Sequence, residues 1–521
     1  MSPTRLRTGR FGVQPVVFGF SVGLTVLFVV LTLANLGAAD AIFGAVKDGI
    51  ARRFGWFFIL SVQGILLLCI YLAASRFGHI RIGGAGARPE FSSLSWFAML
   101  FAAGMGIGLM FWSVAEPVLH LQNPPGAVAM TPEGAQRALD LTFLHWGLHV
   151  WGIYALVGLA LAYFSYNRGL PMTIRSAFHP LLGDRIYGPI GHVLDVLAVL
   201  AALFGLATSL GLGVAQINAG LNHAFGFSFS IGAQLGLVAL ITMASAISVA
   251  SGLERGIKLL SNINLMAALL LLLFVLAAGP TLFLVENLVE STGHYLQNLL
   301  TLGTWTETYS LDSAWQASWT VFYWSWWISW SPFVGMFIAR ISRGRTVREF
   351  VFGVLAMPSL LTFAWMATFG GAAIYESLFV DAGIVTAAND NVATALFELL
   401  SRYPLEDLSV LLAVFLVMIF FVTSCDSGSL VMGILTCGGE TDIRLPQRVF
   451  WAVLAGVVAA VLMLGGGLTA LQTASISTGL PFCVALVFMA VCLVKAFRED
   501  VPAMSDRVAQ DLYRRKPDEL P

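Results

Sequence analysis

Apolar stretches of about 20 residues recur along this 521-residue sequence from near its first residue almost to its last. Each is long enough to cross about 30 Å of hydrocarbon as an α-helix. Hydrophobic residues make up 58% of the chain and charged residues only 11%, so a water-soluble fold could not bury so much apolar surface. The sequence therefore predicts an all-α membrane protein with 12 transmembrane helices, centred near residues 26, 65, 106, 153, 201, 242, 268, 328, 361, 420, 458 and 484.

The basic residues fall unevenly between the two sides that these spans define. With both chain ends on one side, only five of the 28 lysines and arginines lie on the other: Lys47, Arg52, Arg53, Arg137 and Arg402. Cytoplasmic segments of membrane proteins carry an excess of Lys and Arg. The pattern therefore predicts a multi-pass protein with cytoplasmic N- and C-termini. No nucleic-acid partner is expected, because no basic domain lies outside the predicted spans.

Three glycines interrupt the third predicted span, AMLFAAGMGIGLMFW from Ala98 to Trp112. Gly104 and Gly108 have the spacing of a small-residue packing seam between helices. Gly106, midway between them, adds nothing to such a seam but gives the backbone freedom to leave the helix. We expect an unwound segment here, and unwound backbone at membrane depth is tolerated only where it is buried in protein or lines a cavity.

Aromatic residues are concentrated in the fourth and eighth predicted spans. The eighth, WQASWTVFYWSWWISWSPF from Trp315 to Phe333, places three tryptophans near its middle, and the fourth, HWGLHVWGIY from His145 to Tyr154, adds three further aromatic residues. The candidate residues are Trp146, Trp151, Tyr154, Trp326, Trp327 and Trp330. Aromatic faces in a dry cavity suit a cation wrapped in methyl groups, which offers no hydrogen-bond donor. Simple aromatic packing between helices is the alternative interpretation.

Adjacent hydroxyl residues occur deep in two apolar spans. Thr423 and Ser424 lie in FFVTSCDSGS from Phe420 to Ser429, and Thr208 and Ser209 lie in FGLATSLGLG. Hydrogen bonds back to the preceding helical turn explain such hydroxyls without any ligand. Oxygen ligands for a sodium ion are the second explanation, and the residues alone do not decide between the two.

Taken together, these segments resemble the betaine/choline/carnitine transporter (BCCT) family from about residue 12 to residue 498, and in pattern its sodium-coupled glycine betaine members. The strings that carry the resemblance are GMGIG (104–108), the set Trp146, Trp151 and Tyr154, WSWWISWSPF (324–333), ARISRGRT (339–346) and VTSCDS (422–427). The resemblance implies two inverted five-helix repeats, formed by spans three to seven and eight to twelve and preceded by two extra helices. It also implies a homotrimer in the bacterial inner (plasma) membrane.

The domain boundaries expected on this basis divide the chain into six segments. They are a cytoplasmic tail (1–14), two additional transmembrane helices (15–93), the first repeat (94–278), a periplasmic amphipathic helix and loop (279–312), the second repeat (313–497) and a short cytoplasmic C-terminal tail (498–521).

Matched position by position, the resemblance implies three sets of site residues. The aromatic residues named above would surround the quaternary ammonium group, and backbone groups of Gly104, Met105, Gly106 and Gly108 would hold the substrate carboxylate. One sodium site would consist of Ala102, Met105, Phe420, Thr423 and Ser424. A second would consist of Thr208, Ser209 and Phe333, on a looser alignment. No cofactor is expected beyond sodium as the coupling ion.

Two positions narrow the expected function to sodium-driven import of glycine betaine or a related solute. Family members that move choline with protons often carry aspartate where this chain has Gly108, and sodium-independent carnitine-type exchangers lose the hydroxyl pair that Thr423 and Ser424 retain. Proton-coupled choline transport, carnitine-type exchange and uptake of ectoine or dimethylsulfoniopropionate are the alternatives. A membrane-embedded enzyme is disfavoured, because the in-span histidines His145 and His149 are accompanied by no catalytic motif.

Overall fold

The computed structural model describes residues 12–104, 106–251, 254–310 and 314–514, and these ranges consist of helices joined by turns and loops, with no β-strand among them. Eight helices in this part of the chain are each long and apolar enough to cross a membrane. A ninth is added if Asn262–Ala278 and Thr281–Gln297, bent by 111° at a short break, count as one span. The all-helical membrane class is confirmed, whereas the count of 12 spans and the inverted repeats stay predictions.

The difference in count has a structural origin. Every predicted centre lies within a helix except the one at Gly106, where a helix is broken. The two broken halves are each short, the tryptophan-rich eighth helix has low hydropathy, and the last two centres lie within one long helix. Counting each continuous apolar helix once therefore gives fewer spans than the apolar stretches of the sequence predict.

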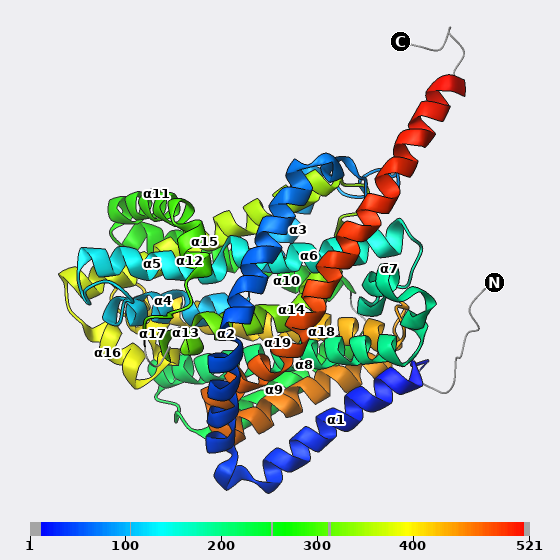
Figure 1. Ribbon diagram of the computed structural model, residues 1–521. Coiled ribbons are helices and arrows are strands. Elements are labelled where there is room, and N and C mark those ends of the chain that lie inside the picture. The colour runs from blue at the N-terminus through cyan, green and yellow to red at the C-terminus, as the bar shows by residue number, and fades with distance from the viewer. Residues whose placement is uncertain (1–11, 105, 252–253, 311–313, 515–521) are drawn as a thin grey trace.

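The first half of the chain runs from the two N-terminal helices to a bent pair (Figure 1). Its helices are α1 (Pro15–Ala34), α2 (Leu36–Ala74), α3 (Ser93–Gly104), α4 (Ile107–Gln122), α5 (Pro132–Trp146), α6 (Leu148–Tyr166), α7 (His179–Leu182), α8 (Pro189–Phe225), α9 (Ile231–Ser251), α10 (Glu254–Ala278), α11 (Thr281–Gln297) and α12 (Leu299–Thr304). Three short 3₁₀ turns lie at Arg76–His79, Ile174–Phe178 and Gly183–Tyr187.

The second half contains the tryptophan-rich helix and the longest helix. Its helices are α13 (Ala314–Ser318), α14 (Thr320–Ile341), α15 (Val347–Phe379), α16 (Gly383–Asp390), α17 (Ala395–Leu400), α18 (Glu406–Thr436) and α19 (Leu445–Arg514), with a 3₁₀ turn at Val392–Thr394. Helix α19 is kinked at Gly466 and Gly467, whose φ angles of 157° and 55° lie in the region that only glycine adopts readily.

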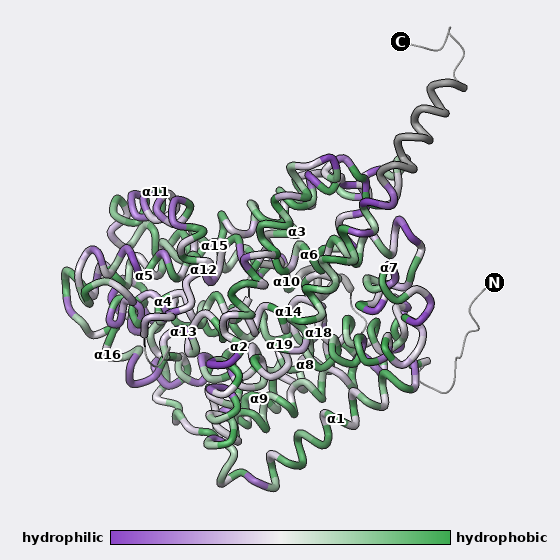
Figure 2. Tube along the Cα trace, in the orientation of Figure 1, coloured by the Kyte–Doolittle hydropathy of each residue, from purple (hydrophilic) through white to green (hydrophobic). Residues whose placement is uncertain are grey.

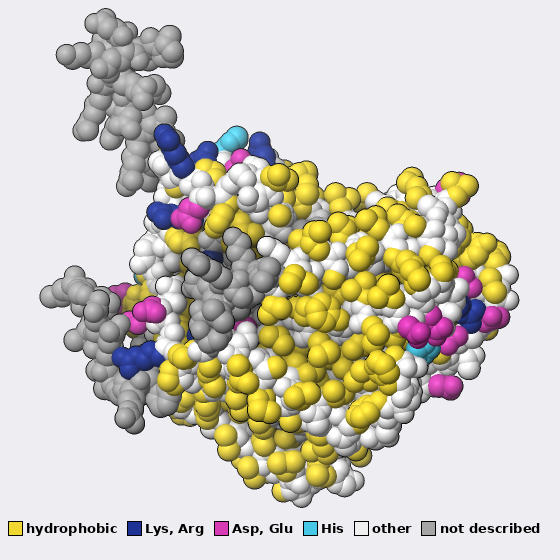
Figure 3. Space-filling view, turned by 180° about the vertical axis from the view of Figure 1, so that it is seen from behind, with side chains coloured by type: hydrophobic (Ala, Val, Ile, Leu, Met, Phe, Trp, Pro, Cys, Tyr) yellow, Lys and Arg dark blue, Asp and Glu magenta, His cyan; other side chains and the backbone are white. Residues whose placement is uncertain are grey.

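The surface has the distribution of a membrane-embedded protein. Hydrophilic residues gather near α11 and α16 at one end and near α7 at the other, with apolar helices between (Figure 2). Figure 3 shows one face whose middle is covered by hydrophobic side chains, while charged side chains collect toward its edges. Large apolar side chains such as Phe20, Leu240 and Leu408 are exposed at the protein surface, as expected where lipid replaces water.

Two glycines bring α6 and α14 into backbone contact. A Cβ atom at Gly335 would lie 2.5 Å from Val157 Cγ1, and one at Gly158 would lie 3.2 Å from the Gly335 carbonyl oxygen. Small residues at such crossings let transmembrane helices approach closely. The contact sets the aromatic residues of α6 opposite those of α14, and it is the local reason why the site described next can form.

Candidate functional site

A cavity of about 260 Å³ lies between the end of α3, the start of α4 and helices α5, α6, α8, α10, α14, α15 and α18. Its size suits a small solute, since pockets for drug-sized ligands hold about 300–1,000 Å³. The residues that line it are Ala102, Gly106, Ile107, Gly108, Leu109, Trp146, Val150, Trp151, Tyr154, Ser209, Asn264, Leu265, Trp326, Trp327, Trp330, Phe333, Val334, Phe337, Thr362, Phe420, Thr423, Ser424 and Ser427. No residue of this set is charged.

All six aromatic residues singled out in the sequence line this cavity. Trp146 meets Trp327 edge to face at 4.9 Å between ring centroids, and Trp151 meets Tyr154 in the same way at 5.4 Å. The break between α5 and α6 at Gly147 separates Trp146 from Trp151, and a Cβ at Gly147 would lie 2.6 Å from the Phe363 ring. The break at Gly147 and the α6–α14 contact therefore bring aromatic residues of three helices, α5, α6 and α14, to one place.

Hydrogen bonds fix the orientation of three of these rings. The Trp327 Nε1–H donates to the His145 carbonyl oxygen at 2.8 Å, and the Trp330 Nε1–H donates to that of Gly205 at 2.8 Å. The Trp146 Nε1–H donates to Glu116 Oε2 at 2.7 Å. Each bond ties the polar edge of an indole to the protein, so the apolar face is free to meet a ligand.

Trp326 differs from the other members of the group. Its ring stacks on both Phe322 and Trp327, with centroid separations of 5.5 and 4.6 Å. It is only 1% exposed. Ring faces that stack on other protein rings are unavailable to a ligand. Trp326 therefore serves mainly as a packing partner of Trp327 and offers little of its own surface to the cavity.

The glycine segment meets the aromatic residues at Gly108. Helix α3 ends at Gly104, Gly106 is extended, and α4 begins at Ile107, so the helix is broken where the glycine pattern predicts. Gly106 and Gly108 line the cavity. Met105 lies outside the described residues, and its expected contacts with substrate and sodium stay predictions.

Four of the five residues expected at the first sodium site line the same cavity: Ala102, Phe420, Thr423 and Ser424. The Thr423 hydroxyl donates to the Ile419 carbonyl oxygen at 2.9 Å. This is the hydrogen bond back to the preceding helical turn (a back-bond) that is the alternative explanation for such a hydroxyl. A hydroxyl that donates this proton keeps its oxygen lone pairs for a cation. The back-bond and a sodium ligand role are therefore compatible.

The second expected sodium set is divided in the structure. Ser209 and Phe333 line the cavity, whereas Thr208 is outside its lining and is directed toward α19. The Thr208 hydroxyl bonds to the Leu471 carbonyl oxygen at 2.9 Å and lies 3.0 Å from Ser475 Oγ. The three residues do not share one cavity wall here, and the site stays a prediction.

The sequence reading missed Asn264 and Ser427, which also line the cavity. The side chain of Asn264 is 3% exposed, and its Oδ1 has no hydrogen-bond partner in the part of the chain that the structure describes. Buried polar atoms are normally paired. An amide within an apolar span was the available signal, as polar groups at membrane depth are functional or paired.

An all-helical protein with lipid-compatible outer faces and an uncharged aromatic cavity beside a broken helix has the architecture of a membrane transporter. The chain belongs to the betaine/carnitine/choline transporter family, because the family described as "BCCT, betaine/carnitine/choline family transporter" matches residues 16–502. The resemblance noted in the sequence is confirmed. The protein is a multi-pass transporter and not an enzyme, as predicted.

Curated relatives agree with this assignment. A glycine betaine/proline/choline/ectoine transporter of Vibrio parahaemolyticus is 45% identical over 95% of this chain and 89% of its own length. A glycine betaine transporter of Acinetobacter baylyi is 42% identical over 96% of this chain and 76% of its own. The high-affinity choline transport protein of Escherichia coli is 41% identical over 93% of this chain and 72% of its own length.

Proposed function

We propose that the protein imports glycine betaine, or a closely related betaine-type solute, by alternating access. The observation that carries the proposal is the uncharged cavity with Trp146, Trp151, Tyr154, Trp327 and Trp330 around it. A methylated ammonium group gains about 0.5–2 kcal/mol from each aromatic face that it meets in a dry site. A zwitterion brings its own carboxylate, so it needs no charged protein group in the cavity wall.

The names of the relatives support this class of solute and also include choline, proline and ectoine. Choline is the second candidate, because it shares the trimethylammonium group. The uncharged lining favours the zwitterion, since a bare cation would leave an unbalanced charge in a low-dielectric cavity.

We propose sodium as the coupling ion, bound by Thr423 and Ser424 with carbonyl oxygens near Ala102. The support is that these residues line the same cavity as the aromatic residues. Inverted repeats, a homotrimer in the bacterial inner membrane and cytoplasmic termini belong to the same proposal, on the positive-inside pattern and on family membership.

A ligand screen on the purified protein tests the solute class. Thermal unfolding is followed with glycine betaine, choline, carnitine, proline, ectoine and dimethylsulfoniopropionate, each with and without sodium. A ligand that binds only the folded state raises the midpoint by an amount that grows with the ratio of its free concentration to its Kd. We expect the largest shift for glycine betaine, and only with sodium present. A shift for none of the methylated solutes would overturn the proposal.

Replacing the hydroxyl pair tests the ion site. In the double variant Thr423→Ala and Ser424→Ala, two oxygen ligands are lost while the helix keeps its backbone. We expect the sodium concentration for half-maximal uptake to rise at least tenfold, about 1.4 kcal/mol. The matched control is Thr436→Ala, which removes a buried back-bonded hydroxyl from the same helix outside the cavity. An unchanged sodium dependence in the double variant would move the ion site elsewhere.

A further inference from the structure

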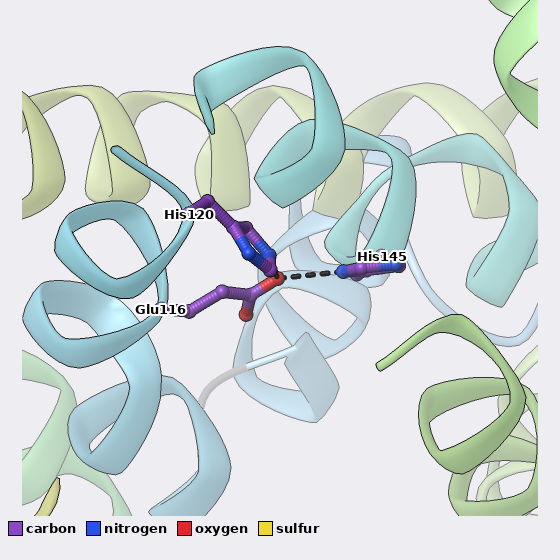
Figure 4. Close-up of side chains that lie close together, drawn as sticks. All are labelled: Glu116, His120 and His145. Atoms are coloured by element: carbon purple, nitrogen blue, oxygen red, sulfur yellow. Dashed lines mark hydrogen bonds and ion pairs between the residues drawn. The ribbon is translucent and has the colours of Figure 1, made fainter. Parts of the chain in front are cut away.

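The six aromatic residues singled out in the sequence, Trp146, Trp151, Tyr154, Trp326, Trp327 and Trp330, line the cavity and are called the aromatic wall below. Behind this wall lies the buried carboxylate of Glu116, together with two histidines (Figure 4). Glu116 of α4, His120 one turn later and His145 of α5 are each 0% exposed. Glu116 Oε1 lies 2.6 Å from His145 Nδ1 and 3.3 Å from His120 Nε2. A fully buried carboxylate at membrane depth is costly, so it calls for a function or a complete set of partners.

The geometry fits a hydrogen-bonded network better than a metal site. Two ligands of a tetrahedral zinc ion, each about 2.0–2.1 Å from the metal, stand about 3.3 Å apart. The 2.6 Å between Glu116 Oε1 and His145 Nδ1 is too short for that arrangement and is close to the length of a charge-assisted N–H···O hydrogen bond, about 2.7–2.9 Å. The other carboxylate oxygen is already engaged by protein donors.

Those donors connect the carboxylate to the cavity. Glu116 Oε2 accepts the Nε1–H of Trp146 at 2.7 Å and the hydroxyl of Tyr323. An ionised carboxylate has about four acceptor positions and no donor. Four partner atoms surround Glu116, which matches that capacity. His145 completes the chain, with its Nε2 3.0 Å from Thr320 Oγ1 on α14.

From this geometry we infer that Glu116 is a positioning residue for the aromatic site, acting through Trp146. Its carboxylate holds the indole N–H, so the ring face stays turned toward the cavity and its electron density rises on that face. A more electron-rich ring attracts a cation more strongly. The inference rests on the proposed function, because it assigns a role in binding a quaternary ammonium group.

The position of Glu116 explains how a cavity with an uncharged lining can still attract the ammonium end of a zwitterion. The negative charge lies one side chain behind the wall, where it is paired with its own donors and does not meet the ligand directly. Tyr323, which shares the carboxylate, also packs against Trp146 at 5.6 Å and Trp327 at 6.0 Å between ring centroids. The carboxylate of Glu116 therefore binds Trp146 directly, and its second partner, Tyr323, packs against Trp327.

A double-mutant cycle tests the inference. The equilibrium affinity for glycine betaine is measured by calorimetry on the purified full-length protein for the wild type, Glu116→Gln, Trp146→Phe and the combination. We expect Glu116→Gln to weaken binding roughly tenfold, the scale of a lost hydrogen bond to a charged group. Because Glu116 acts through the indole N–H, the combined variant should bind within about twofold of Trp146→Phe alone.

Two further variants separate positioning from folding. Asp140→Asn is the control, since Asp140 is a buried carboxylate on the same helix as Trp146 that bonds to a histidine, His294, away from the cavity. It should leave the affinity within about twofold. Glu116→Asp keeps the charge but draws the carboxylate back from the indole, so it should weaken binding as well and serves if Glu116→Gln does not fold.

The outcomes distinguish the inference from the proposed function. Wild-type protein that binds no methylated ammonium solute overturns the proposed function and the inference with it. Wild-type binding that is unchanged in Glu116→Gln and Glu116→Asp overturns the inference alone. Effects of Glu116→Gln and Trp146→Phe that simply add would also overturn it, because Glu116 would then act by a route other than Trp146.

Discussion

Replacing Trp327 with alanine is expected to weaken glycine betaine binding at least about 100-fold, about 3 kcal/mol. Trp327 lines the cavity, meets Trp146 edge to face and stacks on Trp326. Its removal takes away one aromatic face and leaves its neighbours free to collapse into the space. The affinity measured by calorimetry, together with initial rates of uptake, checks this result.

Loss of a buried tryptophan also costs about 3–5 kcal/mol of stability, so folding has to be monitored alongside binding. Trp327→Phe keeps an aromatic face and should lose far less affinity than the alanine variant. Trp56→Ala is the matched control, since Trp56 is 57% exposed on the surface of α2. Full affinity in a folded Trp327→Ala protein would remove Trp327 from the site.

Gly108→Ala is expected to weaken binding roughly thirtyfold, about 2 kcal/mol, by overpacking the aromatic wall. A Cβ atom at this position would lie 2.7 Å from Trp326 Cη2 and 3.1 Å from Trp146 Cη2. Both rings are held, Trp146 by Glu116 and Trp326 by its stacking partners, so they cannot move without disturbing the cavity. Calorimetry with glycine betaine measures the change.

The control for this substitution is Gly64→Ala, at an exposed position of α2 where an added Cβ meets nothing within 4 Å. It should leave both affinity and thermal stability near the wild-type values. If Gly108→Ala binds glycine betaine as tightly as the wild type, the close contact of Gly108 with the tryptophans does not govern the shape of the site.

The fold class could be predicted from the sequence because membrane helices obey a single strong constraint. Backbone polar groups in hydrocarbon must be satisfied within the segment, so long apolar runs identify helices directly. The break at Gly106 could be predicted because three glycines in five residues remove side chains that would stiffen the helix. The number of spans is harder to predict from length and hydropathy. Tryptophan-rich α14 is too polar on the hydropathy scale to be counted, and kinked α19 is counted as one helix although it contains two predicted spans.

The aromatic wall could be predicted because Trp326, Trp327 and Trp330 recur within one turn at the middle of a span, where lipid offers tryptophan no interface. Glu116 could not be placed behind that wall, since three of its four partners come from other helices: Trp146 and His145 from α5 and Tyr323 from α14. The direction of Thr208 toward α19 likewise depends on how helices pack. Periodicity within one helix carries no information on that packing.

The central claim is tested most directly by uptake of labelled glycine betaine into proteoliposomes that contain only this protein. Sodium is imposed outside the vesicles, and in the parallel arm it is replaced by potassium, because choline, the other common replacement cation, is itself a candidate substrate. We predict accumulation above the external concentration with the sodium gradient and none with potassium. Equal uptake in both arms would contradict sodium coupling, and no uptake in either arm, from protein shown to be folded, would contradict the assigned solute.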